Sequence, residues 1–167
     1  DAMPLCCNFW DKDLRNIDCN EATTKLFGLP SKQVYLDRFF DLSPEYQPDG
    51  QPSPKAALER VRLAFETGYQ RFEWMHQSLA KEPIPSEIIL VRVKHGDGYI
   101  VVGYTRDLRE FKAMLADMHE ANERTRIMLD ATPLCCNFWD EHYNNIDCNE
   151  EAAKLFGLSS KQEYLDR

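Results

Sequence analysis

The residues of this chain that could do chemistry are its cysteines and histidines, and their spacing favours no common reactive site. The cysteines form no CxxC pair, and an adjacent Cys-Cys on a strand points its two side chains to opposite faces. Small buried apolar side chains in a reducing compartment are the preferred interpretation, with a redox or metal role as the alternative. No histidine lies in a HExxH or other metal-binding spacing. The residues are Cys6, Cys7, Cys19, Cys135, Cys136, Cys148, His76, His95, His119 and His142.

Other catalytic patterns are not recognisable in the sequence, and we expect no enzyme here. It contains no Gly-rich phosphate loop, Ser/His/Asp set or convergent carboxylate pair. The net charge is −8 and no basic run occurs, which argues against nucleic-acid binding. No stretch approaches the roughly 20 apolar residues of a membrane span. We therefore expect no membrane contact by this chain and a cytoplasmic location.

The elements that must position these residues are repeated along the chain. Residues 1–38 recur without a gap as residues 130–167, with 28 of 38 positions identical. The repeating unit is far longer than the roughly 20–50 residues of a solenoid repeat, so it is a whole domain. We expect a domain over 1–110, a linker helix over 107–130 and the N-terminal part of a second, truncated copy over 130–167. Residues 130–167 could replace their counterpart in a neighbouring chain, which would be a domain swap.

The hydrophobic pattern predicts an α+β domain: a five-stranded antiparallel sheet with small helices on one face. The strand from 86 to 93 is apolar at both parities, so we expect the other face to be covered by a flanking helix or a partner subunit. The expected strands are 5–10, 15–19, 70–79, 86–93 and 99–105, and the expected helices are 21–27, 31–38 and 54–67. Residues 43–54 and 81–85 are expected to be loops, and 95–98 a tight hairpin turn.

Three segments carry a resemblance to the PAS family over residues 1–110. They read IDCNEATTKLFGL, RFEWMHQSLAKEPIPSEIILVRV and GYIVVGYTRDLREFK. The resemblance implies a sensory module of a bacterial signalling protein, such as a two-component histidine kinase or a diguanylate cyclase, with adjacent PAS repeats and an output domain as its partners. Haem-binding members use a histidine on the long helix, and residues 54–67 contain none. The flavin photoreceptor motif Asn-Cys-Arg-Phe is absent, so neither haem nor flavin is expected.

A pocket for an unknown small molecule is one interpretation of the space between sheet and helices, and a solid aromatic core without a ligand is the other. A pocket requires space and a few convergent polar groups. A structural role is favoured for the single histidine among the candidates. The candidate lining residues are Phe9, Phe27, Phe65, Phe72, Trp74, His76 and Tyr104.

The linker is expected to begin with a capping box in which Asp107 and Glu110 each accept the other's backbone N–H. That cap would join the last strand to the helix, as a signal junction. An apolar 3-4 spacing then predicts a parallel dimeric coiled coil, and hence a homodimer through the linker helix and the sheet face. The seam residues are Leu108, Phe111, Leu115, Met118, Asn122, Thr125 and Leu129. A competing stripe would pack the helix onto its own domain: Met114, Met118, Ala121, Thr125 and Met128.

Overall fold

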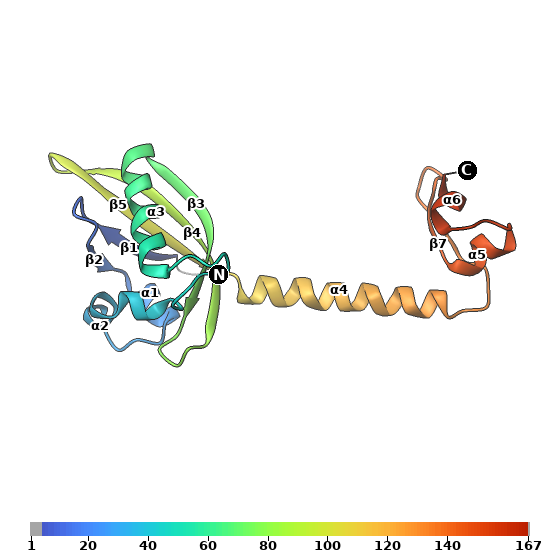
Figure 1. Cartoon of the computed structure of the whole chain (residues 1–167), viewed down its shortest axis with the longest axis horizontal. Helices are drawn as coiled ribbons and strands as arrows, with labels where there is room; N and C mark the ends of the chain where they lie inside the picture. Colours follow the sequence, from blue (N-terminus) through green and yellow to red (C-terminus); the bar gives the residue numbers. More distant parts are fainter. Residues whose placement is uncertain (1–4, 167) are drawn as a thin grey trace. The chain divides into compact units, whose positions relative to one another are not determined.

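Five antiparallel strands form the sheet of the first of two compact units, in the order β2-β1-β5-β4-β3 (Figure 1). The structure is a computed structural model and describes residues 5–166. The units are Asp1–Phe111 and Lys112–Arg167. The strands are β1 (Cys6–Trp10), β2 (Asn16–Cys19), β3 (Tyr69–Gln77), β4 (Pro83–His95) and β5 (Gly98–Asp107). The predicted α+β fold with a five-stranded antiparallel sheet is confirmed.

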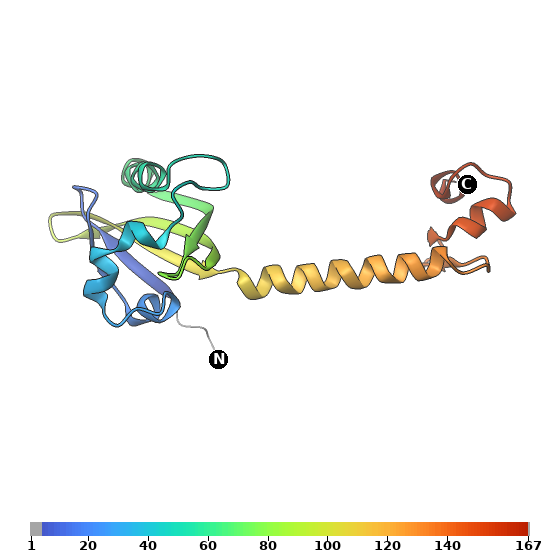
Figure 2. The same cartoon turned by 60° about the horizontal axis from the view of Figure 1, so that its bottom comes forward.

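The helices of this unit begin and end where local chemistry predicts. The Asn20 side chain caps α1 (Glu21–Leu26) by accepting the N–H of Thr23, and the Ser31 side chain caps α2 (Lys32–Asp37). A short 3-10 helix, η1 (Phe39–Leu42), follows. The long helix α3 (Ser53–Thr67) has a proline in its first turn and ends at Gly68, whose φ of 91° favours glycine. It lies along one face of the sheet (Figures 1 and 2).

Two apolar clusters fill the space between this face and the helices. One joins α3 to the centre of the sheet: Trp10, Ala56, Val61, Ala64, Trp74, Ile88, Leu90 and Val101. The other lies under the small helices: Cys19, Phe27, Leu29, Tyr35, Leu42 and Ile84. Because alternate residues of a strand face opposite sides, the residues between these positions form the second face. That face carries partly or fully buried apolar side chains, among them Phe9, Ile89, Val91 and Val102. What covers it stays a prediction.

Strand β4 is longer than expected, because it includes residues placed in a loop. Pro83 and Pro85 pair with β3 alone, since pairing with β5 begins at Ser86. Both prolines present their missing N–H groups to the same side of the strand. On that side, β5 does not pair with β4 at these two positions, so no strand N–H is needed there. The two prolines are therefore tolerated, as they would be on an edge strand.

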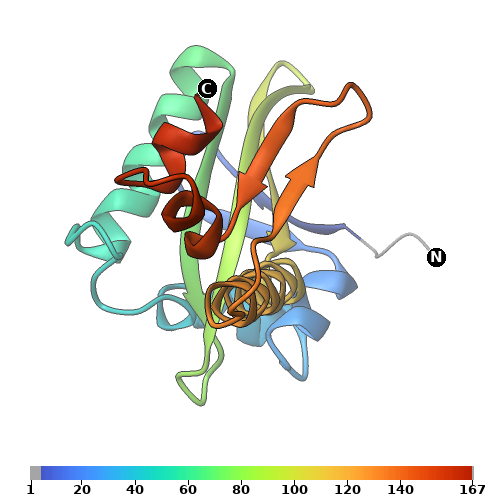
Figure 3. The same ribbon diagram turned by 90° about the vertical axis from the view of Figure 1, so that its right-hand side faces the viewer.

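The long helix α4 (Arg109–Asp130) leads into the second unit, and none of its residues is buried. Beyond α4, the second unit contains a hairpin, β6 (Asn137–Trp139) and β7 (Asn145–Cys148), with α5 (Glu150–Leu155) and α6 (Lys161–Leu165) (Figure 3). The β6–β7 pairing, including its bulge, reproduces that of β1–β2 at the equivalent residues. The equivalent tryptophans differ in exposure, however: 3% for Trp10 and 59% for Trp139.

Candidate functional site

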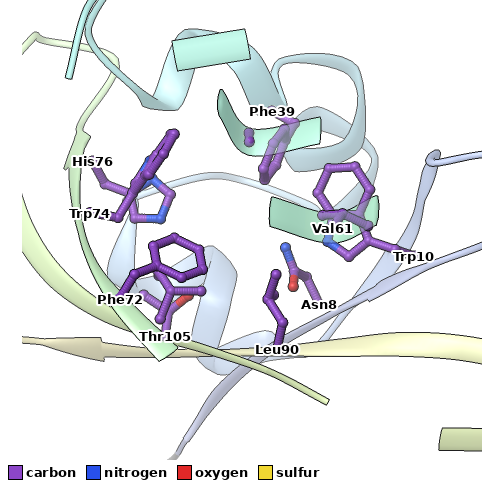
Figure 4. A pocket seen from close by; sticks show the side chains of 11 residues that line it. Asn8, Trp10, Phe39, Val61, Phe72, Trp74, His76, Leu90 and Thr105 are labelled. Atoms are coloured by element: carbon purple, nitrogen blue, oxygen red, sulfur yellow. The ribbon is translucent and has the colours of Figure 1, made fainter. Parts of the chain in front are cut away.

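A small cavity of about 40 Å³ lies between the inner face of the sheet and helices η1 and α3 (Figure 4). Its wall is mostly aromatic and aliphatic, with three polar side chains. The lining residues are Asn8, Trp10, Phe39, Ala57, Val61, Phe72, Trp74, His76, Ile88, Leu90 and Thr105. Small-molecule sites usually measure roughly 300–1,000 Å³, whereas a single water needs only about 10–15 Å³. The cavity has room for a few water-sized groups.

The polar groups around this cavity are held by buried hydrogen bonds. The Asn8 amide donates to the Tyr35 hydroxyl at 2.8 Å, and burial raises the pKa of that tyrosine. The indole N–H of Trp74 donates to the Ser43 hydroxyl at 3.0 Å. The Nδ1 atom of His76 lies 3.0 Å from the Leu42 carbonyl oxygen. A carbonyl can only accept, so we assign the ring proton to Nδ1.

His76 is the buried titratable group of the site. Its side chain packs edge-on against Phe27, with the ring centroids 5.1 Å apart. Burial lowers its pKa from 6.5 to about 4, with the Leu42 carbonyl opposing the shift. The imidazole is therefore neutral at pH 7. A neutral, hydrogen-bonded ring surrounded by aromatic residues fits the structural role favoured from the sequence.

Two glutamines tie the segment between η1 and α3 to strand β3. The Gln47 side chain accepts the Met75 N–H at 2.8 Å and donates to the Met75 carbonyl at 3.1 Å. Gln77 donates to the carbonyls of Asp41 and Ser43 at 2.9 and 3.0 Å. These bonds fix the segment between η1 and α3 to strand β3. Sequence reasoning missed both glutamines, because neither belongs to a recognisable motif.

The structure brings together only part of the predicted lining set. Phe72, Trp74 and His76 do line the cavity. Phe27 and Phe65 contribute to the apolar clusters instead of the cavity wall. Phe9 and Tyr104 were placed on the wrong face. They lie beside the lining residues Asn8 and Thr105, and strand alternation turns neighbours to opposite sides. Applying alternation from the buried Trp10 would have selected Asn8 in place of Phe9.

The junction between β5 and α4 contains a cap that differs from the predicted one. The Asp107 carboxylate accepts the backbone N–H of Arg109 at 2.9 Å, instead of that of Glu110. The shift arises because α4 begins at Arg109. Arg109 also pairs with the carboxylate at 2.6 Å. Partial burial raises the pKa of Asp107, but the hydrogen bonds from Arg109 outweigh it and lower the pKa.

The junction is also held from β4. The N–H of Leu108 donates to the Pro85 carbonyl at 2.9 Å, and the Leu108 side chain is 7% exposed. The start of α4 is therefore tied to both β4 and β5: Leu108, just before the helix, bonds to Pro85, and Arg109, its first residue, bonds to Asp107.

The expected seam of α4 is mostly exposed along this chain. Phe111, Leu115 and Met118 are 51%, 44% and 57% exposed. The competing stripe is exposed as well, with Met114 at 69% and Met128 at 71%. The coiled coil stays a prediction. In the second unit, the later seam residues line a groove of about 470 Å³ beside β6 and β7: Asn122, Thr125 and Leu129.

The cysteines and acidic residues give no sign of a reactive centre. All six cysteines are free. Burial raises the pKa of Cys6 to about 11, so its thiol is protonated and a poor nucleophile at pH 7. Within residues 5–166, no group of three His, Cys, Asp or Glu side chains is placed to hold a metal ion. No helix in that range is long and apolar enough to cross a bilayer.

An antiparallel five-stranded sheet, with helices enclosing a small core cavity and a long helix leaving the last strand, defines a PAS-type α+β domain. A sequence profile described as the PAS fold matches residues 1–113. The chain belongs to the PAS family. No curated protein matches the chain.

Solved structures share the fold at low sequence identity. A PAS domain from a two-component sensor histidine kinase is 12% identical, covers 62% of this chain and 84% of its own, and has a TM-score of 0.47. An RNA-binding light-oxygen-voltage receptor is 20% identical over 71% of this chain and 34% of its own, with a TM-score of 0.51. The LOV domain of a blue-light activated histidine kinase from Erythrobacter litoralis is 18% identical over 63% and 96%, with a TM-score of 0.48.

Proposed function

We propose that this chain is a non-enzymatic PAS module that passes a signal from its sheet to helix α4, in a bacterial signal-transduction protein such as a two-component histidine kinase. The observation that carries the proposal is the junction. The start of α4 is bonded to Pro85 at the end of β4 and to Asp107 at the end of β5. A PAS sheet that shifts would move the helix without an intervening flexible linker.

The repeated sequence and the matching hairpins of the two units support a tandem arrangement. We propose that 130–167 opens a second PAS repeat and that α4 connects the two. The partners of the module are then neighbouring PAS repeats and an output domain, such as a kinase or a diguanylate cyclase. The buried free cysteines favour a reducing, cytoplasmic setting.

The cavity limits what the module senses. A volume of about 40 Å³ favours an occupant of a few atoms over a flavin or a haem, and its lining residues include no cysteine for a photochemical bond. Within this family of folds, the second candidate is therefore a ligand-free interaction or spacer module, and the filled aromatic core favours it. Native mass spectrometry of the purified protein distinguishes sensing by ligand from a ligand-free spacer. A bound molecule of defined mass would support sensing by ligand, whereas bare protein would support the spacer.

Signal transfer through α4 requires a partner for its exposed seam. We propose a parallel homodimer through α4, continued by the apolar outer face of the sheet. Asn122 would then be a polar seam residue that weakens the dimer and leaves it able to change packing. Asn122→Leu should give a tighter dimer in sedimentation equilibrium and a lost signal response in the parent protein. Asp117→Leu, on the opposite side of the helix, is the control. Equal dimer affinities for Asn122→Leu and the unsubstituted chain would contradict the seam.

A further inference from the structure

The end of α4 is bonded to the rest of the second unit by a buried amide and by an ion pair. Asn149 is 1% exposed. Its Oδ1 accepts the N–H groups of Cys136 and Ala152 at 3.0 and 3.2 Å. Its Nδ2 donates to the carbonyls of Leu134 at 2.7 Å and Leu129 at 2.9 Å. Leu129 lies in the last turn of α4, where helix carbonyls lack partners within the helix.

The first copy shares three of these four contacts. The counterpart of Asn149 is Asn20, whose side chain bonds to the backbone of Leu5, Cys7 and Thr23. These three contacts correspond to those of Asn149 with Leu134, Cys136 and Ala152. The fourth contact, with Leu129, makes the last turn of α4 part of the hydrogen-bonded frame of the second unit.

One equivalent lysine forms an ion pair in each copy. In the first copy, Lys32 pairs with Asp18 at 3.1 Å, and both side chains are about half exposed, at 47% and 53%. In the second copy, Lys161 pairs with Asp130, the last residue of α4, and these side chains are only 20% and 31% exposed. The residue equivalent to Asp18 is Asp147. The counterpart of Asp130 is Asp1, which lies outside the described residues.

Both carboxylates lie in the same groove as Lys161. Asp130, Asp147 and Lys161 line one groove beside α4, together with Arg126. The Asp130 carboxylate also accepts the Glu150 N–H at 3.4 Å, at the start of α5. The hydrogen bond from Lys161 lowers the pKa of Asp130, so this carboxyl is ionised at neutral pH. Lys161 is therefore paired with a carboxylate of the helix, and the Lys32–Asp18 pair of the first copy identifies Asp147 of the hairpin as its equivalent alternative.

We propose that Lys161 is a latch for α4, with two alternative ion pairs. Paired with Asp130, it holds the end of the helix on the second unit. Paired with Asp147, as Lys32 pairs with Asp18, it releases the helix and leaves Asn149 as the remaining tie. This inference rests on the proposed function, because it describes how a movement of α4 would enter the following PAS repeat. Lys161 and Asn149 are then positioning residues at the receiving end of the relay.

Hydrogen exchange of the full chain, followed by mass spectrometry, tests the latch. Asp130→Asn and Lys161→Met should each speed exchange of the amides of residues 126–132 by about fivefold, as expected for one partly exposed ion pair. Asp147→Asn removes the alternative partner and should slow exchange of the same amides. Lys32→Met, the equivalent change in the first copy, should leave them unchanged. Amides of residues 150–155 report whether the second unit stays folded.

Three results would overturn the latch: unchanged exchange in Asp130→Asn, faster exchange in Asp147→Asn, or an equal effect of Lys32→Met and Lys161→Met on residues 126–132. If Lys161→Met unfolds the second unit, the two aspartate variants still test the latch. Exchange of residues 126–132 should be faster in Asp130→Asn and slower in Asp147→Asn. The experiment needs no ligand, signal or dimer. A failure of the proposed signalling function would therefore leave its outcome readable.

Discussion

His76 should make the stability of the first unit depend on pH in a defined direction. Burial lowers its pKa from 6.5 to about 4 in the folded chain. The unfolded chain therefore takes up the proton more readily, and the free energy of unfolding decreases as the pH falls from 6.5 toward 4. One pKa unit corresponds to about 1.4 kcal/mol. Going from pH 7 to pH 5 should thus remove about 2 kcal/mol through this residue alone, and the full loss near pH 4 approaches about 3 kcal/mol.

The assay is urea unfolding followed by tryptophan fluorescence in a Trp139→Phe background, so that Trp10 and Trp74 report on the first unit. His76→Gln should be less stable than its parent at pH 7, because it loses a packed and hydrogen-bonded ring. The difference in free energy of unfolding between this variant and its parent should shrink by about 2 kcal/mol at pH 5. Only the parent has a buried histidine whose protonation favours the unfolded chain. His95→Gln, at the exposed end of β4, is the control substitution. Identical pH dependence in His76→Gln and its parent would refute this reasoning.

Two further predictions use matched pairs of residues in the same chain. A methyl group on Gly103 would lie 2.1 Å from Asn8 Oδ1, so Gly103→Ala should displace that buried amide and cost about 1–3 kcal/mol in urea unfolding. Gly98→Ala, with nothing within 4 Å, should change stability by less than about 0.5 kcal/mol, and equal costs would contradict the packing. Trp10→Ala should cost about 3–5 kcal/mol. Trp139→Ala, at a side chain 59% exposed, should cost less than about 0.5 kcal/mol. A large loss in the second variant would show that Trp139 is covered in solution.

Much of this fold can be predicted from the sequence, because local patterns specify its elements. Runs of apolar and aromatic residues between turn residues predict the strands. Asn20 and Ser31 cap the small helices, and Gly68 ends α3. The extension of β4 to Pro83 is not predictable in this way. Two prolines argue against a strand until it is known that this end of β4 pairs on one side only.

The site is less predictable, because it depends on which side each chain segment faces and on how tightly side chains fill space. Phe9 and Asn8 are neighbours, yet only Asn8 lines the cavity. Phe9 and Tyr104 are aromatic, which suggested a position in the interior. The outer face of the sheet is also apolar, so an aromatic residue can lie on either face. The volume of the cavity depends on how closely the side chains pack, which the amino-acid composition does not predict. The contact of Asn149 with Leu129 depends on where α4 ends, and helix ends are only approximately encoded.

The central claim is that α4 carries the signal as a dimer through one face. Sedimentation velocity of this chain over a range of concentrations tests it most directly, with Leu115→Asp on the seam and Ala113→Asp on the opposite side of the helix. We predict a concentration-dependent dimer for the unsubstituted chain and for Ala113→Asp. Leu115→Asp should weaken the dimer at least about tenfold, because it places a charge in an apolar contact. A chain that is monomeric at every concentration, or two variants with equal dimer affinity, would contradict the claim.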